Sequence, residues 1–152
     1  MTHVLPNGVE VSSFLDTTDW PGSGFGLRQR RIILGDPNDP TRPILVLTHF
    51  PPNAVLPRHF HGDTFVDAVV EGTSTIEGET HGPGTVRVFP KHAMYGPVLA
   101  GPEGCVLLEF YVDAPGFATT LDLPSLTDEM RADLMARLGR IPGEEPPAAP
   151  GA

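Results

Sequence analysis

Two histidines, His59 and His61, stand one residue apart in the segment LPRHFHGDTFVDAVVEG. On a β-strand their side chains point to the same face, about 6.6 Å apart along the chain. If residues 62–64 form a hairpin loop, His61 lies opposite Phe65 and His59 lies opposite Asp67, with Cβ atoms of opposite residues roughly 4.5–5.5 Å apart. Two imidazoles and one carboxylate on one face are the ligands of non-haem Fe(II) oxygenases, which leave positions open for substrate and oxygen.

The same residues also allow interpretations without a metal. Two histidines alone are too few for a tight site, so His59 and His61 can instead be hydrogen-bonded pocket residues. Asp67 would then hydrogen-bond His59 and fix its tautomer. A slip of one residue in the strand register would send Asp67 to the opposite face, so its place depends on the assumed hairpin. A divalent metal ion (iron, manganese, nickel or zinc) on His59, His61 and Asp67 is the expectation, with these alternatives open.

The composition predicts one globular domain rich in short strands. The chain has 152 residues, of which 39 % are apolar, and its 17 glycines and 18 prolines favour tight turns over long helices. The net charge of −9 argues against nucleic acid as a partner, because phosphate binding needs a basic surface. The only basic cluster, Arg28, Arg30 and Arg31, is interpreted as part of a solvated strand.

The sequence predicts a cytoplasmic protein that does not bind a membrane. No apolar run approaches the roughly 20 residues that span a bilayer, and the start of the chain lacks the features of a signal peptide. Cys105 is the only cysteine, so no internal disulfide is possible and a reducing compartment is expected. Because Cys105 lies in the apolar run CVLLEFYV, we expect it to be a small core residue.

Strands are predicted almost everywhere up to about residue 113. The runs LRQRRIILG and RPILVLTHF are separated by DPNDPT, which is dense in turn residues, so they are predicted to form a hairpin. FVDAVVEG, STIEGE and TVRVF follow as further short strands. CVLLEFYVD has two faces that both look largely buried, namely Cys105, Leu107, Glu109 and Tyr111 on one side and Val106, Leu108, Phe110 and Val112 on the other. This pattern predicts an antiparallel sandwich or closed barrel.

The C-terminal part has a helical pattern. Apolar residues recur at helical spacing, which predicts a helix at about residues 127–138 with Thr127 as its N-cap and Gly139 as its C-terminal stop. The tail PGEEPPAAPGA has no core residues and is expected to be disordered. The predicted organisation is an N-terminal extension at 1–26, a β-barrel at 27–113, a helical segment at 114–140 and a tail at 141–152.

The histidine segment resembles the first of two motifs by which the cupin superfamily of small β-barrels is recognised. That motif is glycine, five residues, His-x-His, three or four residues, glutamate, six residues and glycine. His59, His61 and Gly72 match it, and Pro57 and Glu71 also look typical. The residues before this segment resemble the lead-in of the cupin domains of zinc-binding anti-sigma factors.

The second cupin motif is glycine, five residues, Pro-x-Gly, two residues and histidine, and GTVRVFPKHAMYG matches it in Gly84 and Pro90. The resemblance covers about residues 20–113. It implies an all-β fold, an antiparallel double-stranded β-helix or jelly-roll barrel, to which the predicted C-terminal helix is added. It also implies a homodimer, since cupins commonly pair through edge strands, and an exposed edge needs cover.

The chain departs from the cupin pattern at two of the four usual metal ligands. Phe65 stands where cupins place the metal-binding glutamate, and Tyr95 stands at the position of the last metal-binding histidine. His92 replaces the glycine of Pro-x-Gly. A phenylalanine cannot bind a metal, whereas tyrosine is a phenolate donor suited to ferric iron or zinc. Asp67, Tyr95 and His92 are therefore the candidate replacement ligands.

A pocket in the barrel is expected to bind a small apolar or aromatic carbonyl or enol compound, with a lining of Phe65, Val69, Phe89, His92, Met94, Leu107 and Glu109. In a metal-dependent oxygenase, isomerase or lyase, the metal would act as Lewis acid or oxygen activator. Without a metal, His59 oriented by Asp67 would be the catalytic base and Tyr95 a proton donor to a developing enolate. A non-catalytic ligand-binding module is the third possibility.

Overall fold

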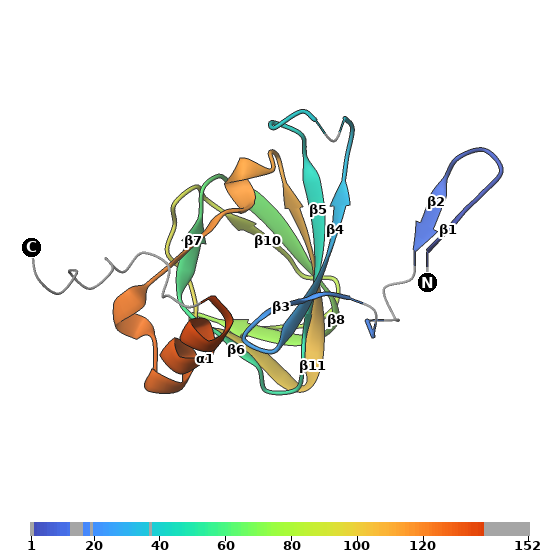
Figure 1. Cartoon of the computed structure of the whole chain (residues 1–152). Coiled ribbons are helices and arrows are strands. Elements are labelled where there is room, and N and C mark those ends of the chain that lie inside the picture. Colours follow the sequence, from blue (N-terminus) through green and yellow to red (C-terminus); the bar gives the residue numbers. More distant parts are fainter. Residues whose placement is uncertain (1, 13–16, 19, 37, 139–152) are drawn as a thin grey trace, which may run out of the picture.

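The structure is a computed structural model that describes residues 2–12, 17–18, 20–36 and 38–138. Its strands are β1 (Thr2–Val4), β2 (Glu10–Ser12), β3 (Gly22–Gly24), β4 (Leu27–Ile33), β5 (Ile44–Phe50), β6 (Val55–Leu56), β7 (His59–His61), β8 (Phe65–Ile76), β9 (Glu79–His81), β10 (Val86–Phe89), β11 (Val98–Tyr111) and β12 (Thr119–Leu121). The helices are the short η1 (Pro115–Phe117) and η2 (Leu123–Ser125) and the longer α1 (Asp128–Leu138). The predicted fold, a mostly antiparallel β-structure with one C-terminal α-helix, is confirmed (Figure 1).

The main sheet has eight strands in the order β10-β8-β11-β5-β4-β3, with β6 beside β11 and β9 beside β8. The predicted hairpin of β4 and β5 is confirmed, because these strands pair antiparallel from Arg28 opposite His49 to Ile33 opposite Ile44. β7 and β12 form a separate two-stranded sheet on another side of the barrel (Figure 1). The main sheet therefore takes in β3, which lies in the predicted N-terminal extension, and the small sheet takes in β12, which lies beyond residue 113.

β8 is longer than the sequence suggests, because it continues through Gly72 instead of ending there. Gly72 has a φ of 68°, in the left-handed region that favours glycine. A Cβ at this position would collide with the main-chain oxygen of Gly104 in β11. The pairing of β8 and β11 shifts register at this point. Gly72 therefore allows two long strands to bend together rather than marking a strand end.

β7, which carries both histidines, does not pair with β8. It pairs with β12, where His61 lies opposite Thr119 and His59 lies opposite Leu121. An isolated bridge joins His59 to Tyr95. The predicted hairpin register of His59 and Asp67 is therefore wrong: residues 62–64 carry the chain from the small sheet to the main sheet rather than reversing it.

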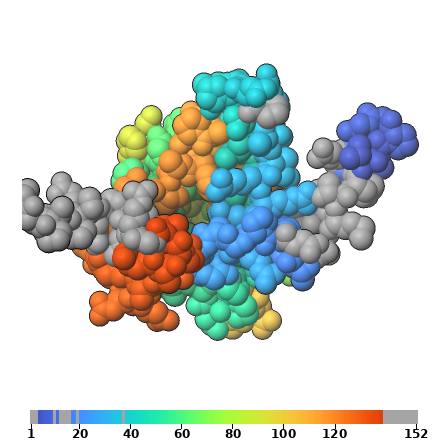
Figure 2. Space-filling view, viewed as in Figure 1, coloured from blue at the N-terminus to red at the C-terminus, as the bar shows by residue number. Residues whose placement is uncertain are grey.

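The predicted C-terminal helix is confirmed as α1. The main-chain N–H of Met130 donates to the Thr127 hydroxyl at 3.2 Å, which is the predicted N-cap bond. Leu134 is buried against Leu126 beside the barrel, and α1 lies next to β3 on the face shown in Figure 2. No helix within the described residues has the length and hydropathy to cross a bilayer. The predicted helix stop at Gly139 and the predicted disordered tail lie outside the described residues.

The outer face of the main sheet is only partly covered. Trp20 packs there against Leu47 and Val106, whereas several apolar side chains nearby stay exposed. These are Val70 of β8, Val86 and Val88 of β10, Phe110 of β11 and Val112 after it. The expectation that both faces of residues 105–113 are buried is thus correct for the inner face, including Cys105, and wrong for Phe110 and Val112 on the outer face.

Candidate functional site

A cavity of about 630 Å³ occupies the inside of the barrel, a usual size for a small-molecule site. Apolar side chains form much of its wall, namely Phe50, Leu56, Val98, Leu107, Phe117 and Leu121. Polar side chains from six strands face the same space, among them Gln29, Arg31, Thr48, His59, His61, Asp67, Arg87 and Glu109. The cavity therefore combines apolar walls with a small number of polar groups that can bind a ligand or transfer a proton.

Both histidines line this cavity with their tautomers fixed by the main chain. Nδ1 of His59 lies 2.7 Å from the main-chain oxygen of Pro57, and Nδ1 of His61 lies 3.0 Å from that of Phe117. A carbonyl oxygen only accepts, so each Nδ1 carries a hydrogen and each Nε2 keeps a lone pair. The pKa of each imidazole is lowered to about 4, by burial for His59 and by burial together with the neighbouring His59 for His61. Both rings are therefore neutral at pH 7.

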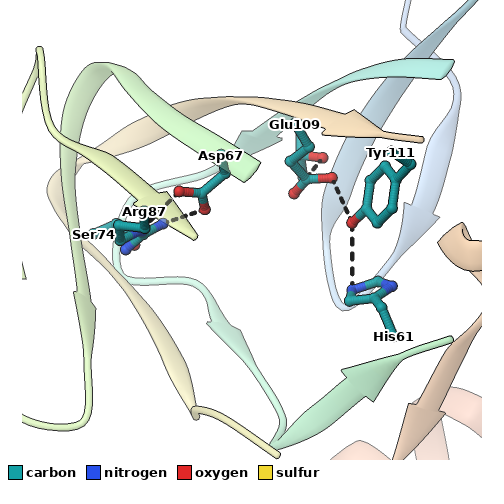
Figure 3. Close-up of polar contacts among 7 residues, drawn as sticks. His61, Asp67, Ser74, Arg87, Glu109 and Tyr111 are labelled. Carbon is teal, nitrogen blue, oxygen red and sulfur yellow. Dashed lines mark hydrogen bonds and ion pairs between the residues drawn. The ribbon is translucent and has the colours of Figure 1, made fainter. Parts of the chain in front are cut away.

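The Tyr111 hydroxyl joins His61 to Glu109 (Figure 3). It lies 3.4 Å from Nε2 of His61 and 3.3 Å from Oε2 of Glu109. Tyr111 has one hydrogen, which it donates to Oε2 when Glu109 is ionised. When Glu109 is protonated, the carboxyl can donate to the Tyr111 oxygen, and the Tyr111 hydrogen is then available to Nε2 of His61. On the other side, the Thr48 hydroxyl lies 3.5 Å from Oε1 of Glu109, and Gln29 donates to Thr48 at 3.1 Å. These bonds hold the Glu109 carboxyl on both of its oxygens.

The pKa of the Glu109 carboxyl lies close to neutral pH. Burial raises the pKa of its carboxyl to about 8, and the nearby charge of Asp67 adds to the effect, against hydrogen bonds from Tyr111 and Thr48 that lower it. Burial also raises the pKa of the Tyr111 hydroxyl. A carboxyl with a pKa near the working pH can both accept and return a proton during a reaction.

Asp67 faces the cavity but is held by an arginine rather than by the histidines. Arg87 donates from Nε to Oδ1 at 2.8 Å and from Nη2 to Oδ2 at 2.6 Å, and a third bond from Nη1 reaches Ser74 at 3.1 Å (Figure 3). Arg87 and Asp67 are direct neighbours on the paired strands β10 and β8. The hydrogen-bond partner of Asp67 is therefore Arg87 and that of His59 is Pro57, which corrects the predicted bond between Asp67 and His59. A role of Asp67 as a metal ligand stays a prediction.

Tyr95 lines the cavity against His59, with ring centroids 4.4 Å apart. The two residues also exchange main-chain hydrogen bonds of 3.1 and 3.0 Å, which fix the rings in this contact. Burial raises the pKa of the Tyr95 hydroxyl well above its usual value, and the charge of Glu109 adds to this. Tyr95 therefore keeps its hydrogen and serves as a wall and as a donor.

The other predicted lining residues fall into two groups. Leu107 and Glu109 line the cavity. Phe65, Val69 and Phe89 fill the core instead, with the Phe65 ring stacked between Phe89 and Tyr111.

Met94 and His92 lie in the turn after β10, where their side chains are exposed rather than directed at the cavity. The His92 backbone adopts a left-handed φ of 60°, as expected for a tight turn. This position corrects their predicted place in the pocket wall.

The sequence analysis missed several cavity residues, among them Gln29, Arg31, Thr48 and Phe117, and it gave no role to Tyr111, which contacts His61 and Glu109. For two of them a signal was present, because Gln29 and Arg31 follow the buried Leu27 at alternate positions of β4. Such spacing places all three side chains on one face of a strand. No local pattern marks Phe117, which belongs to a short helix far along the chain.

The donors around His59 and His61 do not make up the predicted metal shell. The two Nε2 lone pairs suit a metal ion, but the expected carboxylate of Asp67 is bound to Arg87. Among the described residues, no cluster of three or more histidine, cysteine, aspartate or glutamate side chains could hold a metal ion. The oxygen in contact with Nε2 of His61 is instead the Tyr111 hydroxyl.

No protein-family model matches the sequence, and no curated protein matches it. Solved structures do. The anti-sigma factor ChrR of Rhodobacter sphaeroides, solved in complex with SigE, is 24 % identical with a TM-score of 0.51, over 63 % of this chain and 50 % of that chain. A Bacillus subtilis oxalate decarboxylase variant is 19 % identical with a TM-score of 0.55, over 86 % and 36 %. A cupin superfamily protein of Desulfitobacterium hafniense is 15 % identical with a TM-score of 0.44, over 55 % and 75 %.

The likenesses to ChrR and to the decarboxylase, whose TM-scores exceed 0.5, agree with the barrel fold. The chain belongs to the class of jelly-roll β-barrels. Its fold is the cupin fold, with the resemblance to anti-sigma factor domains that the sequence indicates. The matched region spans half the length of ChrR and about a third of the decarboxylase.

Proposed function

We propose that this cupin barrel is an enzyme that binds a small carbonyl compound and moves a proton on it without a metal ion, as isomerases and lyases do. The observation that carries the proposal is the line of contacts from His61 through Tyr111 to Glu109 in the cavity wall. It holds a carboxyl with a pKa of about 8 beside an apolar space. In this assignment Glu109 takes the role of proton acceptor that the sequence suggested for His59.

In the proposed reaction, the Glu109 carboxylate removes a proton from a carbon next to the carbonyl. The electrons of that C–H bond form a carbon–carbon double bond, and the carbonyl oxygen becomes negative. Tyr95, whose hydroxyl stays protonated, donates a hydrogen bond to this oxygen. Glu109 then returns the proton to a neighbouring carbon, which completes an isomerisation. Tyr111 and His61 position the carboxyl throughout.

Proton exchange tests this function before the natural substrate is known. In D₂O, the protein is expected to speed deuterium incorporation next to the carbonyl of small compounds, measured by proton NMR on a panel of ketones and oxo acids. Glu109→Gln is expected to slow exchange about 10²–10⁴-fold, the usual contribution of a general acid or base. The matched control is Glu103→Gln, an exposed glutamate on the same strand. Unchanged exchange in Glu109→Gln would overturn the proposal.

A metal-dependent enzyme is the second candidate, because His59 and His61 both present an Nε2 lone pair with Nδ1 held by a carbonyl. This is the usual arrangement of metal-bound histidines. Metal analysis of protein made without a histidine tag separates the candidates. Stoichiometric metal that is lost in His61→Ala, together with exchange abolished by a chelator, supports the second candidate. Exchange that survives chelation supports the first.

A homodimer through the outer face of the main sheet is also proposed. Val86 and Val88 are 62 % and 66 % exposed on β10, whose second edge pairs with no described strand. An apolar edge of this kind favours pairing with another copy. We expect light scattering to give twice 16.3 kDa for the full chain and a monomer for Val88→Lys. Val55→Lys, an exposed valine on β6, is the control that keeps the dimer. A monomeric unaltered protein would contradict this.

A further inference from the structure

Arg31 lies on the solvated strand β4, as expected, and at the same time lines the cavity of the barrel. Its side chain is exposed to solvent, yet it places its guanidinium carbon 4.4 Å from the centroid of the Phe117 ring. No described carboxylate forms an ion pair with it. By contrast, Arg87 pairs with Asp67, and Arg137 pairs with Asp133. Arg30, which also lines the cavity, has interactions of its own.

Arg31 belongs to one row of side chains that crosses the inner face of the main sheet. Strand pairing aligns, in order, Arg87, Asp67, Glu109, Val46 and Arg31. The first two charges neutralise each other in their ion pair. With Glu109 protonated, the Arg31 charge is the one in this row that lacks a partner. A cavity of this kind attracts an anion.

We infer that Arg31 binds a carboxylate group and that the compounds bound in this barrel are small organic monocarboxylates. The inference rests on the proposed function for the reacting end of the molecule, which lies at Glu109. A guanidinium offers two parallel N–H donors that match the two oxygens of a carboxylate. A dianion such as a phosphate is disfavoured, because Arg31 supplies only one positive charge.

The spacing of the row sets the size of the compound. Arg31 and Glu109 both pair with Val46 of β5, so their strands are two steps apart, or about 10 Å between Cα atoms. Both side chains extend over the cavity from these positions. The carboxylate is therefore expected within a few carbon atoms of the carbon that exchanges its proton.

Phe117 brings the anion site and the proton-transfer residues together. Its ring lies under Arg31 and meets the Tyr111 ring at a centroid distance of 5.1 Å. Its main-chain oxygen accepts the Nδ1 hydrogen of His61. A carboxylate on Arg31 would thus lie beside the same residue that orients His61, so one bound compound can contact both.

Binding of matched pairs tests the inference without any turnover. The probes are benzoate, phenylacetate and phenylpyruvate, each compared with its primary amide by calorimetry at pH 7 in a buffer without carboxylates. At least one carboxylate is expected to bind 10-fold or more tightly than its amide. Arg31→Gln is expected to bring the ratio of carboxylate affinity to amide affinity close to 1. Arg31→Lys is expected to leave an intermediate ratio, because lysine keeps the positive charge but lacks the two parallel N–H donors of a guanidinium. The control is Arg28→Gln on the same strand, an exposed arginine that does not line the cavity.

Several results would overturn the inference. These are a wild-type protein that prefers none of the carboxylates over its amide, a preference that survives in Arg31→Gln, or tighter binding of phenyl phosphate than of benzoate. If circular dichroism shows that Arg31→Gln does not fold, an unchanged ratio in Arg31→Lys overturns it instead.

The two proposals fail separately. A preference lost in Arg31→Gln with no deuterium exchange on any compound keeps the carboxylate site and removes the proposed reaction. Equal exchange on acids and amides keeps the reaction and removes the carboxylate site.

Discussion

Asp67→Asn is expected to lower the free energy of unfolding by about 3–5 kcal/mol, because it leaves the buried Arg87 guanidinium without its carboxylate. The side chains of Arg87 and Asp67 are only 8 % and 4 % exposed, and two short bonds join them. Water cannot replace the lost partner at this depth. Urea unfolding at constant pH measures the effect.

Two controls separate the buried charge from other causes. Removing both partners in Asp67→Leu with Arg87→Met is expected to cost less than Asp67→Asn, since no unpaired charge remains. Asp133→Asn breaks the exposed pair with Arg137 and is expected to cost less than about 1 kcal/mol. If Asp67→Asn leaves stability unchanged while metal content falls, Asp67 serves a metal site as the sequence suggested, and the ion pair is not what anchors it.

Glu109→Gln is expected to stabilise the protein above pH 8 and to leave it unchanged near pH 4.5. The carboxyl has a pKa of about 8 in the folded chain against an ordinary value of 4.5. Between these values the folded state binds more protons than the unfolded state, so the free energy of unfolding falls as pH rises. Stability from the neutral carboxyl is therefore present below pH 4.5 and lost by pH 8. Glutamine stays neutral, and its expected advantage at pH 9 is on the order of 2–4 kcal/mol.

His59 and His61 determine how the free energy of unfolding changes with pH on the acid side. Their pKa values of about 4 lie below the ordinary 6.5, so the unfolded state binds more protons between these values and stability rises with pH there. Unmodified protein is thus expected to be most stable near pH 6.5. Urea unfolding at pH 5, 6.5, 8 and 9 gives the profile, with Glu103→Gln as control. Parallel profiles for the unmodified protein and Glu109→Gln would show that Glu109 does not ionise in this range.

Local patterns predicted the parts of the fold that local forces determine. The β4–β5 hairpin follows from turn residues between two apolar runs, and α1 follows from helical spacing with an N-cap at Thr127. Glu109 and Tyr111 share a face because strand residues alternate, which the sequence also indicates. Each of these features depends on residues close together in the chain.

The site was harder to predict because it depends on pairing over long distances. A hairpin was the simplest local partner for β7, yet β7 pairs with β12, almost sixty residues later. That pairing places His61 beside Tyr111 and Phe117, whereas Asp67 lies on the main sheet in an ion pair with Arg87. Arg28, Arg30 and Arg31 were interpreted as part of a solvated strand, which agrees with the exposure of Arg31. Only the closure of the barrel shows that Arg30 and Arg31 also line a cavity.

Because β7 pairs with β12, residues from the C-terminal part of the chain hold the strand that carries both histidines. Phe117 supplies the carbonyl that decides which nitrogen of His61 carries hydrogen. A shortened chain ending at residue 113 would keep every cupin motif but would lose the hydrogen bond from Nδ1 of His61 to the main-chain oxygen of Phe117. Anyone transplanting this barrel to another scaffold must therefore carry residues 114–138 along, or accept an imidazole that is free to switch tautomer.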